Sequence, residues 1–255
     1  MTIEIIAEIS GCHGGSLENA KNLIFQANVA GATGVKFQCF EPERLARKRV
    51  QNPRIITIYN EGEAALTSLY HETHIPREWF PELIAWAKDG GLTWHASVFD
   101  PDDVTFLETL DCPRYKISSF ETYDDNLLAA VKETGKPLII SYNQDDNFLV
   151  APSGVTTILH ATNYAVPASA AKLRRLRHWA WTQGDLPRGQ FWQWGLSDHT
   201  IDHYAAEIAT TLGAKMIEWH LKLSGVETHD DAFSWPWKEF ETKAKQVREI
   251  EEILK

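Results

Sequence analysis

Two lysines and two histidines occupy short apolar runs of the chain, where such side chains are unusual. Lys36 and Lys116 lie inside runs rich in Val, Ile and aromatic residues, while His199 and His220 lie at the ends of two later runs. A lysine within a strand is costly unless it is paired, so these two are stronger candidates for anion binding than any helix lysine. Histidines on neighbouring strand ends could share a divalent metal, although a single histidine is more often a buried, hydrogen-bonded residue.

More polar residues follow the other apolar runs at the point where each one ends. They are Glu8, His13, Gln38, Asp100, Ser119, Glu121, Ser141, Asn143, His160, Asn163, Ser197 and Asp198. Hydroxyl and amide donors beside two lysines suit a phosphate or a carboxylate, since lysine supplies charge and the neutral donors supply orientation. The set predicts an anion cradle, provided that the fold brings these strand ends together.

Eight apolar runs alternate with segments of helical periodicity, which is the pattern of repeated βα units. The predicted strands are 5–9, 34–39, 92–99, 115–118, 137–141, 156–160, 193–196 and 216–220, and the predicted helices are 17–30, 78–89, 102–110, 123–133, 168–181, 201–212 and 237–254. The strands are continuously apolar, as in a covered parallel sheet. Eight units in 255 residues favour an α/β protein with a single (β/α)8 TIM barrel over 1–255, whose site lies at the carboxyl ends of the strands.

Two connections depart from a regular barrel. Residues 41–75, after the second strand, are expected to form a long, lid-like loop with one short helix, and residues 142–155 a degenerate unit after strand five. The basic cluster at Arg44, Arg47, Lys48 and Arg49 is either a solvated loop face or a lid that gathers an anionic acceptor.

Composition excludes several classes of function. The chain has 25 Lys and Arg against 35 Asp and Glu, a net charge of −10, which argues against nucleic-acid binding. It has neither an apolar stretch of about 20 residues nor the basic start of a signal peptide, so we expect a cytoplasmic protein without a membrane span. Three cysteines without a CxxC pair indicate neither a disulfide framework nor a cysteine zinc site.

The motifs at the strand ends, in their order along the chain, resemble the sialic acid synthase family. They include Ile6-Ala-Glu-Ile with His13-Gly-Gly, Val35-Lys-Phe-Gln, Tyr115-Lys-Ile-Ser-Ser-Phe-Glu, Leu159-His-Ala-Thr-Asn, Gly195-Leu-Ser-Asp-His-Thr, Ile217-Glu-Trp-His and Asp230-Asp-Ala-Phe-Ser. The resemblance covers the barrel from end to end. It implies an enzyme that condenses phosphoenolpyruvate with an N-acylhexosamine-like aldehyde to give a 2-keto-3-deoxy sugar acid, with release of phosphate.

The resemblance also implies a role for each matching residue. Lys36, Lys116, Ser119, Ser141, Asn163 and Ser197 would contact phosphoenolpyruvate, and His199 and His220 would bind a divalent ion, expected to be Mn²⁺ with Mg²⁺ or Co²⁺ as alternatives. Glu8 would orient or deprotonate water, Glu121 would contact the sugar, and Asp230 would position the sugar or handle a proton. Gln38, Tyr164 and Asp198 are candidates for the acceptor side.

Departures from the family pattern fall on the acceptor side. The chain ends at Lys255, without the family's C-terminal antifreeze-like domain; Cys12 replaces an asparagine, and Ala165 stands where a tyrosine is common. We expect an acceptor other than standard N-acetylmannosamine, or a separate chain that completes the site, and by resemblance a homodimer. The alternatives are a non-catalytic descendant that binds phosphoenolpyruvate or a sugar phosphate, and a barrel lyase or isomerase that uses the same cradle in reverse.

Overall fold

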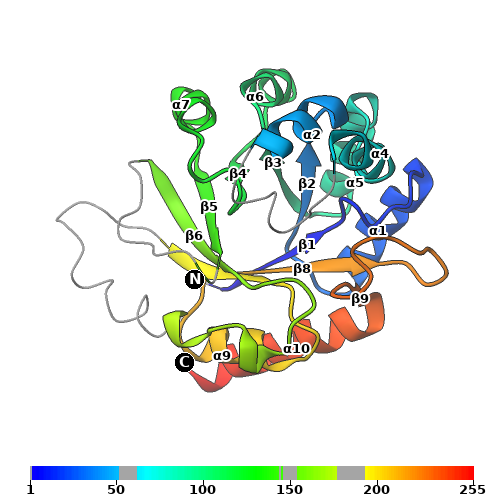
Figure 1. Ribbon diagram of the computed structural model, residues 1–255. Coiled ribbons are helices and arrows are strands. Elements are labelled where there is room, and N and C mark those ends of the chain that lie inside the picture. The colour runs from blue at the N-terminus through cyan, green and yellow to red at the C-terminus, as the bar shows by residue number, and fades with distance from the viewer. Residues whose placement is uncertain (1, 52–61, 144, 146–153, 177–192) are drawn as a thin grey trace.

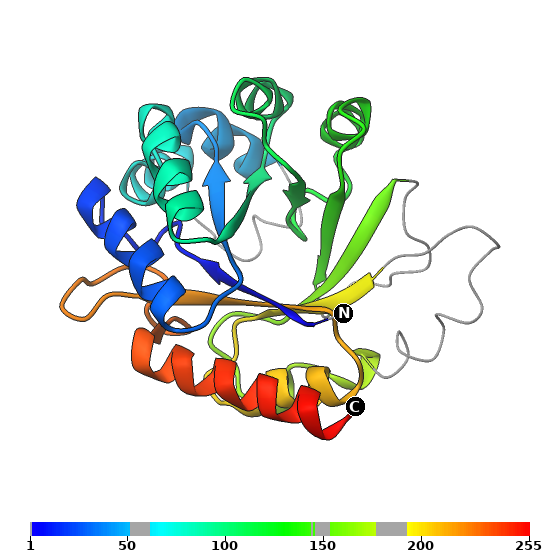
Figure 2. The same cartoon turned by 180° about the vertical axis from the view of Figure 1, so that it is seen from behind.

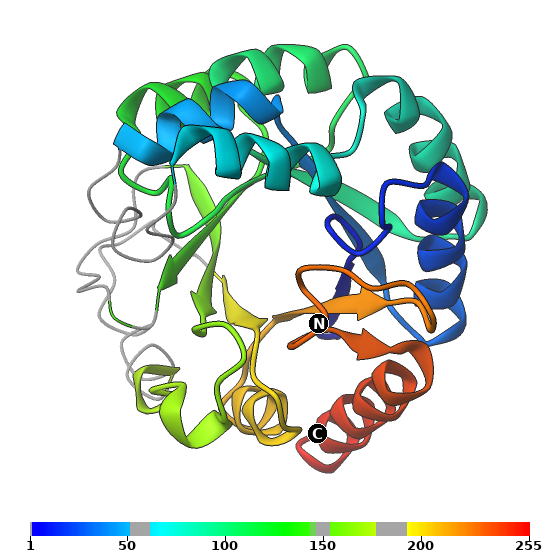
Figure 3. The same ribbon diagram turned by 45° about the vertical axis from the view of Figure 1, so that its right-hand side comes forward.

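The computed structural model describes residues 2–51, 62–143, 145, 154–176 and 193–255. Its parallel strands are β1 (Glu4–Glu8), β2 (Gly34–Cys39), β3 (Thr93–Val98), β4 (Tyr115–Ile117), β5 (Leu138–Asn143), β6 (Val155–Ala161), β7 (Gln193–Asp198) and β8 (Met216–Lys222). They pair in sequence order, and β1 also pairs with β8, which closes the barrel. Figure 3 shows the ring of strands with helices outside it. The predicted (β/α)8 fold is confirmed.

The helices form the outer layer. They are α1 (Leu17–Val29), α2 (Pro42–Gln51), α4 (Glu63–Thr73), α5 (Phe80–Asp89), α6 (Pro101–Glu108), α7 (Asp125–Glu133), α9 (Tyr204–Thr211) and α10 (Trp237–Ile253), with short 3₁₀ turns at Arg77–Trp79 and Ala168–Ala170. Ser16 caps α1 by accepting a hydrogen bond from the Asn19 amide, as its position in the sequence indicates. Figures 1 and 2 show α9 and α10 on the opposite side of the barrel from α6 and α7.

The connection after β2 differs from the prediction. In place of a loop with one short helix, it contains both α2 and α4, which pack against each other in the structure. Helix α2 buries Pro42, Leu45, Ala46 and Arg49, one face at helical spacing, and its abundance of charge concealed this amphipathic pattern. The predicted degenerate unit after strand five and the second half of the predicted helix 168–181 lie largely outside the described residues.

The barrel interior changes from apolar to charged toward the carboxyl ends of the strands. Toward the amino ends of the strands, the interior holds a cluster of four buried side chains, Ile6, Ile139, Leu159 and Met216. Side chains alternate between the two faces of a strand, so Glu8, two residues after Ile6, and Glu218, two after Met216, also face inward. A small strand β9 (Trp235–Pro236) pairs with the end of β8.

No helix in the described part of the chain is long and apolar enough to cross a membrane.

Candidate functional site

A buried carboxylate holds both strand lysines together inside the barrel. Glu218 Oε1 accepts hydrogen bonds from Lys36 Nζ at 2.8 Å and from Lys116 Nζ at 2.6 Å. The Ser197 hydroxyl donates to the same oxygen at 3.0 Å. All four side chains are buried. The structure therefore brings together Lys36, Lys116 and Ser197, three of the residues predicted to contact an anion.

Burial and charge act differently on the two lysines. Burial alone would lower the pKa of Lys36, but Glu218 and Glu8 outweigh it and raise that pKa above its ordinary value. Burial lowers the pKa of Lys116 to about 7, and Glu218 offsets only part of this effect. Within the described residues, Lys116 donates to Glu218 alone, so it has N–H groups left for an anion.

Glu8 lies beside this pair at the end of β1. Its Oε2 is 2.7 Å from Lys36 Nζ and accepts a hydrogen bond from Gln38 Nε2 at 3.3 Å, and its Oε1 accepts from the Ser10 amide at 2.7 Å. These contacts fix the orientation of a carboxylate that points into the barrel. The predicted residues Glu8 and Gln38 thus belong to the same interior cluster as the lysines.

Three buried side chains of strands β1 to β8 have polar atoms without a hydrogen-bond partner among the described residues. They are Ser141 on β5, through Oγ, His95 on β3, through both ring nitrogens, and Glu218 on β8, through Oε2. His95 is paired in register with Lys36, so both side chains face the interior. Burial lowers the pKa of His95 far below its ordinary value, which makes the ring neutral. An unsatisfied buried hydroxyl in the barrel that holds the two lysines is what a cradle for an anion would present before binding.

The two predicted metal histidines lie side by side. Their ring centroids are 5.4 Å apart. His199 Nδ1 lies 2.8 Å from the Thr162 carbonyl oxygen, so that nitrogen carries the proton and Nε2 keeps its lone pair. Burial, together with His220, lowers the pKa of His199 to about 3, and the neutral ring is the form that binds a metal. Tyr164 contacts His199 in a tilted arrangement, with the ring centroids 4.7 Å apart and an interplanar angle of 57°.

Two further potential ligands surround His220. Its Nδ1 is 3.3 Å from Asp230 Oδ2 and 3.9 Å from Cys12 Sγ. The ligand atoms of Cys12, His220 and Asp230 all lie within 4.8 Å of one another. Burial, reinforced by Asp230, raises the pKa of the Cys12 thiol well above its ordinary value. Imidazole, carboxylate and thiol together suit a divalent transition metal, so these residues fit such an ion.

Glu121 lies farther out, after β4, where it contacts the connection that follows β2. Its Oε1 is 2.7 Å from Arg49 Nη1, and Ser118 Oγ donates to its other oxygen. Arg49 is buried and packs over Phe120, with the guanidinium carbon 4.8 Å from the ring centroid. The interpretation of the basic cluster as a solvated loop face is therefore wrong for Arg49, because it forms a buried ion pair.

Of the remaining predicted residues, Asn163 and Ser119 lie in the loops that follow the strands, whereas Asp198 points away from the barrel interior. Asn163 accepts a hydrogen bond from Asn143 Nδ2 at 2.9 Å at the barrel mouth, and Ser119 is half-buried in the turn after β4. Asp198 does not join the interior cluster. Its Oδ2 accepts from Trp219 Nε1 at 2.9 Å and its Oδ1 from the Thr200 hydroxyl at 2.7 Å. Ser197 faces the lumen, so the next residue on the strand, Asp198, faces the surrounding helices. Its role as an acceptor contact stays a prediction.

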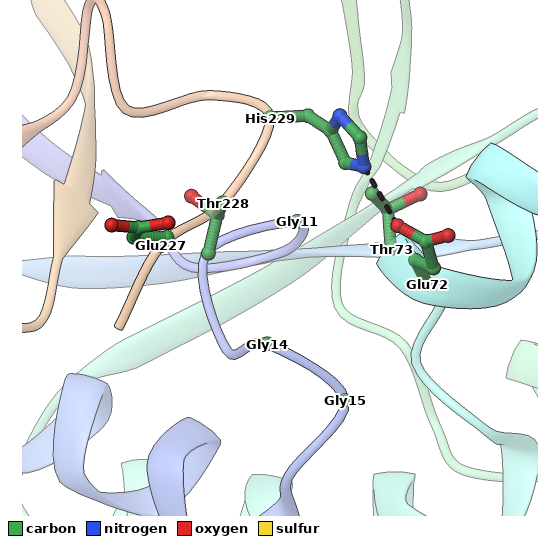
Figure 4. Close-up of a pocket in the computed structure, with 8 residues that line it drawn as sticks. All are labelled: Gly11, Gly14, Gly15, Glu72, Thr73, Glu227, Thr228 and His229. Atoms are coloured by element: carbon green, nitrogen blue, oxygen red, sulfur yellow. Dashed lines mark hydrogen bonds and ion pairs between the residues drawn. The ribbon is translucent and has the colours of Figure 1, made fainter. Parts of the chain in front are cut away.

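A pocket of about 460 Å³ opens beside the metal candidates. Figure 4 shows it between the loop after β1, the end of α4 and the loop after β8. Its lining is formed by Gly11, Gly14, Gly15, Glu72, Thr73, Glu227, Thr228 and His229. His229 Nε2 and Glu72 Oε2 are 2.9 Å apart and link the loop after β8 to α4. Gly11 connects pocket and cluster, since a Cβ there would lie 2.7 Å from Asp230 Oδ2.

Comparison with known proteins decides the relationship. Residues 23–255 match the NeuB family. The chain belongs to the NeuB family. It is 30% identical over 270 residues to the pseudaminic acid synthase of Campylobacter jejuni subsp. jejuni serotype O:23/36 (strain 81-176), over 98% of this chain and 74% of that protein. It is 28% identical over 273 residues to the N,N'-diacetyllegionaminic acid synthase of Legionella pneumophila (strain Philadelphia 1), over 100% of this chain and 74% of that one.

A solved structure agrees with the fold. The N-acetylneuraminic acid synthetase of Leptospira borgpetersenii superposes with a TM-score of 0.81 at 21% identity, over 100% of this chain and 85% of that one. At this identity the likeness shows the TIM-barrel fold. Membership of the NeuB family supports an enzyme of the sialic acid synthase kind, in a family that generally uses a divalent metal.

Three residues of this NeuB-family site were not singled out from the sequence. Glu218, which holds both lysines, stands two residues before His220 on the same strand, and this spacing of two was the signal for an inward-facing side chain. His95 is buried and is paired in register with Lys36, and its position in the middle of an apolar run gave no sign of a place in the site. Cys12 was noted only as a replacement for an asparagine, since the cysteines form no CxxC pair, and the structure places its sulfur beside His220 and Asp230.

Proposed function

We propose that this chain condenses phosphoenolpyruvate with the aldehyde of an N-acylhexosamine-like sugar, giving a 2-keto-3-deoxy sugar acid and inorganic phosphate. The observation that carries the proposal is the convergence of two buried lysines and Ser197 on Glu218 inside the barrel of a NeuB-family protein. Buried ammonium groups are costly, and a carboxylate that holds them in place keeps them ready for an anionic substrate. The alternative is a non-catalytic descendant that binds phosphoenolpyruvate or a sugar phosphate.

The phosphoenolpyruvate side would use Lys36, Lys116, Ser141, Ser197, Asn163 and Ser119. Lys116 supplies N–H groups that Glu218 does not use, and Ser141 supplies a hydroxyl that has no partner among the described residues. Binding of an anion would favour the charged form of Lys116 and so offset the effect of burial on its pKa.

The metal side would use His199 and His220, with Mn²⁺ as the expected ion and Mg²⁺ or Co²⁺ as alternatives. The Thr162 carbonyl fixes the His199 tautomer, which leaves Nε2 to face a ligand. A bound divalent ion would act as a Lewis acid toward the aldehyde oxygen of the acceptor.

The acceptor side would be the pocket lined by Gly11, Glu72, Glu227 and His229, together with Glu121, Gln38 and Tyr164. The pocket offers carboxylate, hydroxyl and imidazole groups suited to a polyhydroxylated sugar. The named products of the two relatives, pseudaminic acid and N,N'-diacetyllegionaminic acid, motivate an acceptor other than N-acetylmannosamine.

The proposed reaction balances with one molecule of water. C3 of phosphoenolpyruvate forms a bond to the aldehyde carbon, water adds at C2, and the C2–O bond to phosphate breaks as the keto group forms. Lys36 and Lys116 would hold the substrate in position for attack, so proximity and preorganised charge lower the barrier. Glu8, fixed by Lys36 and the Ser10 amide, would orient or deprotonate the water, and Asp230 would position the sugar or handle a proton.

The test is phosphate release from phosphoenolpyruvate with Mn²⁺ and a panel of N-acylated aldoses. We expect release that depends on both an aldose and the metal, and loss of phosphoenolpyruvate binding in Lys116→Ala. Lys245→Ala is a matched control, because Lys245 lies on the exposed face of α10 and forms an ion pair with Glu241 of the same helix. Binding of phosphoenolpyruvate without release for any aldehyde would favour the non-catalytic alternative. A cytoplasmic location, a homodimer and a separate chain that completes the site belong to the same proposal. The mass of the purified chain in solution tests the homodimer, fractionation of cells tests the location, and the mass of the complex isolated from cells tests the separate chain.

A further inference from the structure

Cys12 is the unusual member of the cluster around His220. Its side chain is fully buried in the loop after β1, with Sγ 3.9 Å from His220 Nδ1 and 3.7 Å from Ser234 Oγ. Asp230 completes the group, and the three ligand atoms lie within 4.8 Å of one another. Sulfur and oxygen donors from two separate loops thus meet a nitrogen donor from strand β8 at one point of the barrel mouth.

The backbone around this point is arranged to permit the approach. Gly11, directly before Cys12, has a φ of +77°, and a Cβ at that position would lie 2.7 Å from Asp230 Oδ2. The Ser234 hydroxyl donates to the Asp230 carbonyl oxygen at 2.7 Å and braces the opposite loop. A side chain at position 11 would therefore displace the Asp230 carboxylate from its place beside His220.

We propose that Cys12 is a protein ligand of the divalent cation, in a site that also uses His220 and Asp230 beside His199. This inference rests on the metal site of the proposed function and deepens it. On binding, the thiol loses its proton to solvent and the sulfur donates an electron pair to the ion, with no change of oxidation state. A thiolate among imidazole and carboxylate donors shifts selectivity toward Zn²⁺ and Co²⁺ and away from Mg²⁺.

A different arrangement would leave Cys12 without a role in metal binding. His220 Nδ1 could donate a hydrogen bond to Asp230 Oδ2, at 3.3 Å, and so orient the ring for ligation through its other nitrogen. Cys12 would then only fill space beside the ring. The two arrangements differ in whether sulfur is bonded to the ion, which spectroscopy reads directly.

The experiment is a titration of the full chain with Co²⁺, after removal of metal by a chelator, followed by absorption spectroscopy. We expect visible ligand-field bands from bound Co²⁺ and a near-ultraviolet band from charge transfer between sulfur and cobalt. Cys12→Ser should lose the near-ultraviolet band and keep the visible bands. Cys112→Ser is the matched control, because Cys112 is also buried but donates to the Arg114 carbonyl oxygen elsewhere in the fold, and this variant should keep both.

Each other outcome has a distinct meaning. Visible bands without a sulfur band in the parent chain, or a sulfur band that persists in Cys12→Ser, would overturn the role of Cys12 and leave the proposed function standing. Failure of the parent chain to bind Co²⁺ at all would overturn the metal site itself. Competition adds a second measurement: the preference for Zn²⁺ over Mn²⁺ should fall at least tenfold in Cys12→Ser, and an unchanged preference would contradict the proposal. Circular dichroism of each variant verifies folding.

Discussion

Replacement of Glu218 by glutamine removes the charge that both buried lysines share. Lys36 would retain Glu8 at 2.7 Å, whereas Lys116 would lose the only carboxylate that contacts it within the described residues. Removal of one partner from a buried ion pair costs about 3–5 kcal/mol. Glutamine keeps an oxygen that can accept a hydrogen bond, so we expect a loss near the lower end, about 3 kcal/mol in the free energy of unfolding at pH 6.

The loss should depend on pH because it falls on Lys116. Burial already lowers the pKa of this lysine to about 7, and without Glu218 that pKa falls further below the value in the unfolded chain. The unfolded state then binds more protons than the folded state, so the stability of the variant rises with pH. Above pH 7 Lys116 loses its charge in both folded proteins, and the deficit of Glu218→Gln relative to the parent chain should shrink.

Urea unfolding at pH 6 and pH 8.5 measures this deficit. Glu241→Gln is the matched control, since it removes an exposed i,i+4 pair with Lys245, a kind of pair worth about 0.3–0.5 kcal/mol. Equal stability of Glu218→Gln and the parent chain at pH 6 would refute the view that Glu218 compensates buried ammonium charge. A deficit that is the same at both pH values would place its origin outside Lys116.

Three further predictions concern the scaffold around the site. Gly11→Ala should destabilise the chain by about 1 kcal/mol more than Gly15→Ala in urea unfolding, the lower end of the usual cost of overpacking, since both glycines have positive φ but only Gly11 faces the flexible Asp230 side chain; equal losses would contradict the close contact. Burial raises the pKa of Asp103 to about 6. Between pH 4 and pH 6 the folded state therefore keeps a proton on Asp103 that the unfolded chain has lost. The free energy of unfolding should then fall with rising pH, by up to about 3 kcal/mol. Asp103→Asn should lack this slope in urea unfolding across the same range, and a variant that keeps the slope would assign it to another group. Asp124→Ala should lower the free energy of unfolding by about 1 kcal/mol, because Asp124 caps α7 through the Leu127 amide, and thermal unfolding without a shift would argue against the cap.

The sequence predicted the barrel better than it predicted the directions of side chains. Strands buried on both faces appear as continuous apolar runs, so all eight were found. The same continuity hides which residues face inward. Asp198 was selected for its position at a strand end, yet Ser197 takes the inward place. Side chains two residues apart on a strand point to the same face, so one known inward residue identifies the others on that strand. If His220 faces inward, Glu218 on the same strand must face inward too.

Contacts between distant segments were beyond the sequence. Cys12 and Asp230 are separated by more than 200 residues, and only the closure of β1 on β8 brings their loops together. The pairing of Arg49 on α2 with Glu121 after β4 arises in the same way. Spacing along the chain carries no information about such pairs, whereas a local motif such as the Ser16 cap could be recognised directly.

The charge around the site argues against a basic lid as the source of anion affinity. Arg44 contacts Asp100, Arg47 contacts Glu63 and Lys48 contacts Asp124. With the pair of Arg49 and Glu121, each cation of α2 already has a carboxylate partner, so the predicted anion-gathering lid has little charge to offer.

The barrel interior is balanced in the same way, since the charges of the two lysines equal those of Glu8 and Glu218 when all four are ionised. A trianionic substrate therefore brings more negative charge than this cluster can neutralise. The proposed divalent ion beside His199 and His220 would supply the missing positive charge at the mouth of a chain whose net charge is −10. In the proposed reaction the lysines would fix the position of phosphoenolpyruvate, and the affinity for it would depend on the metal site.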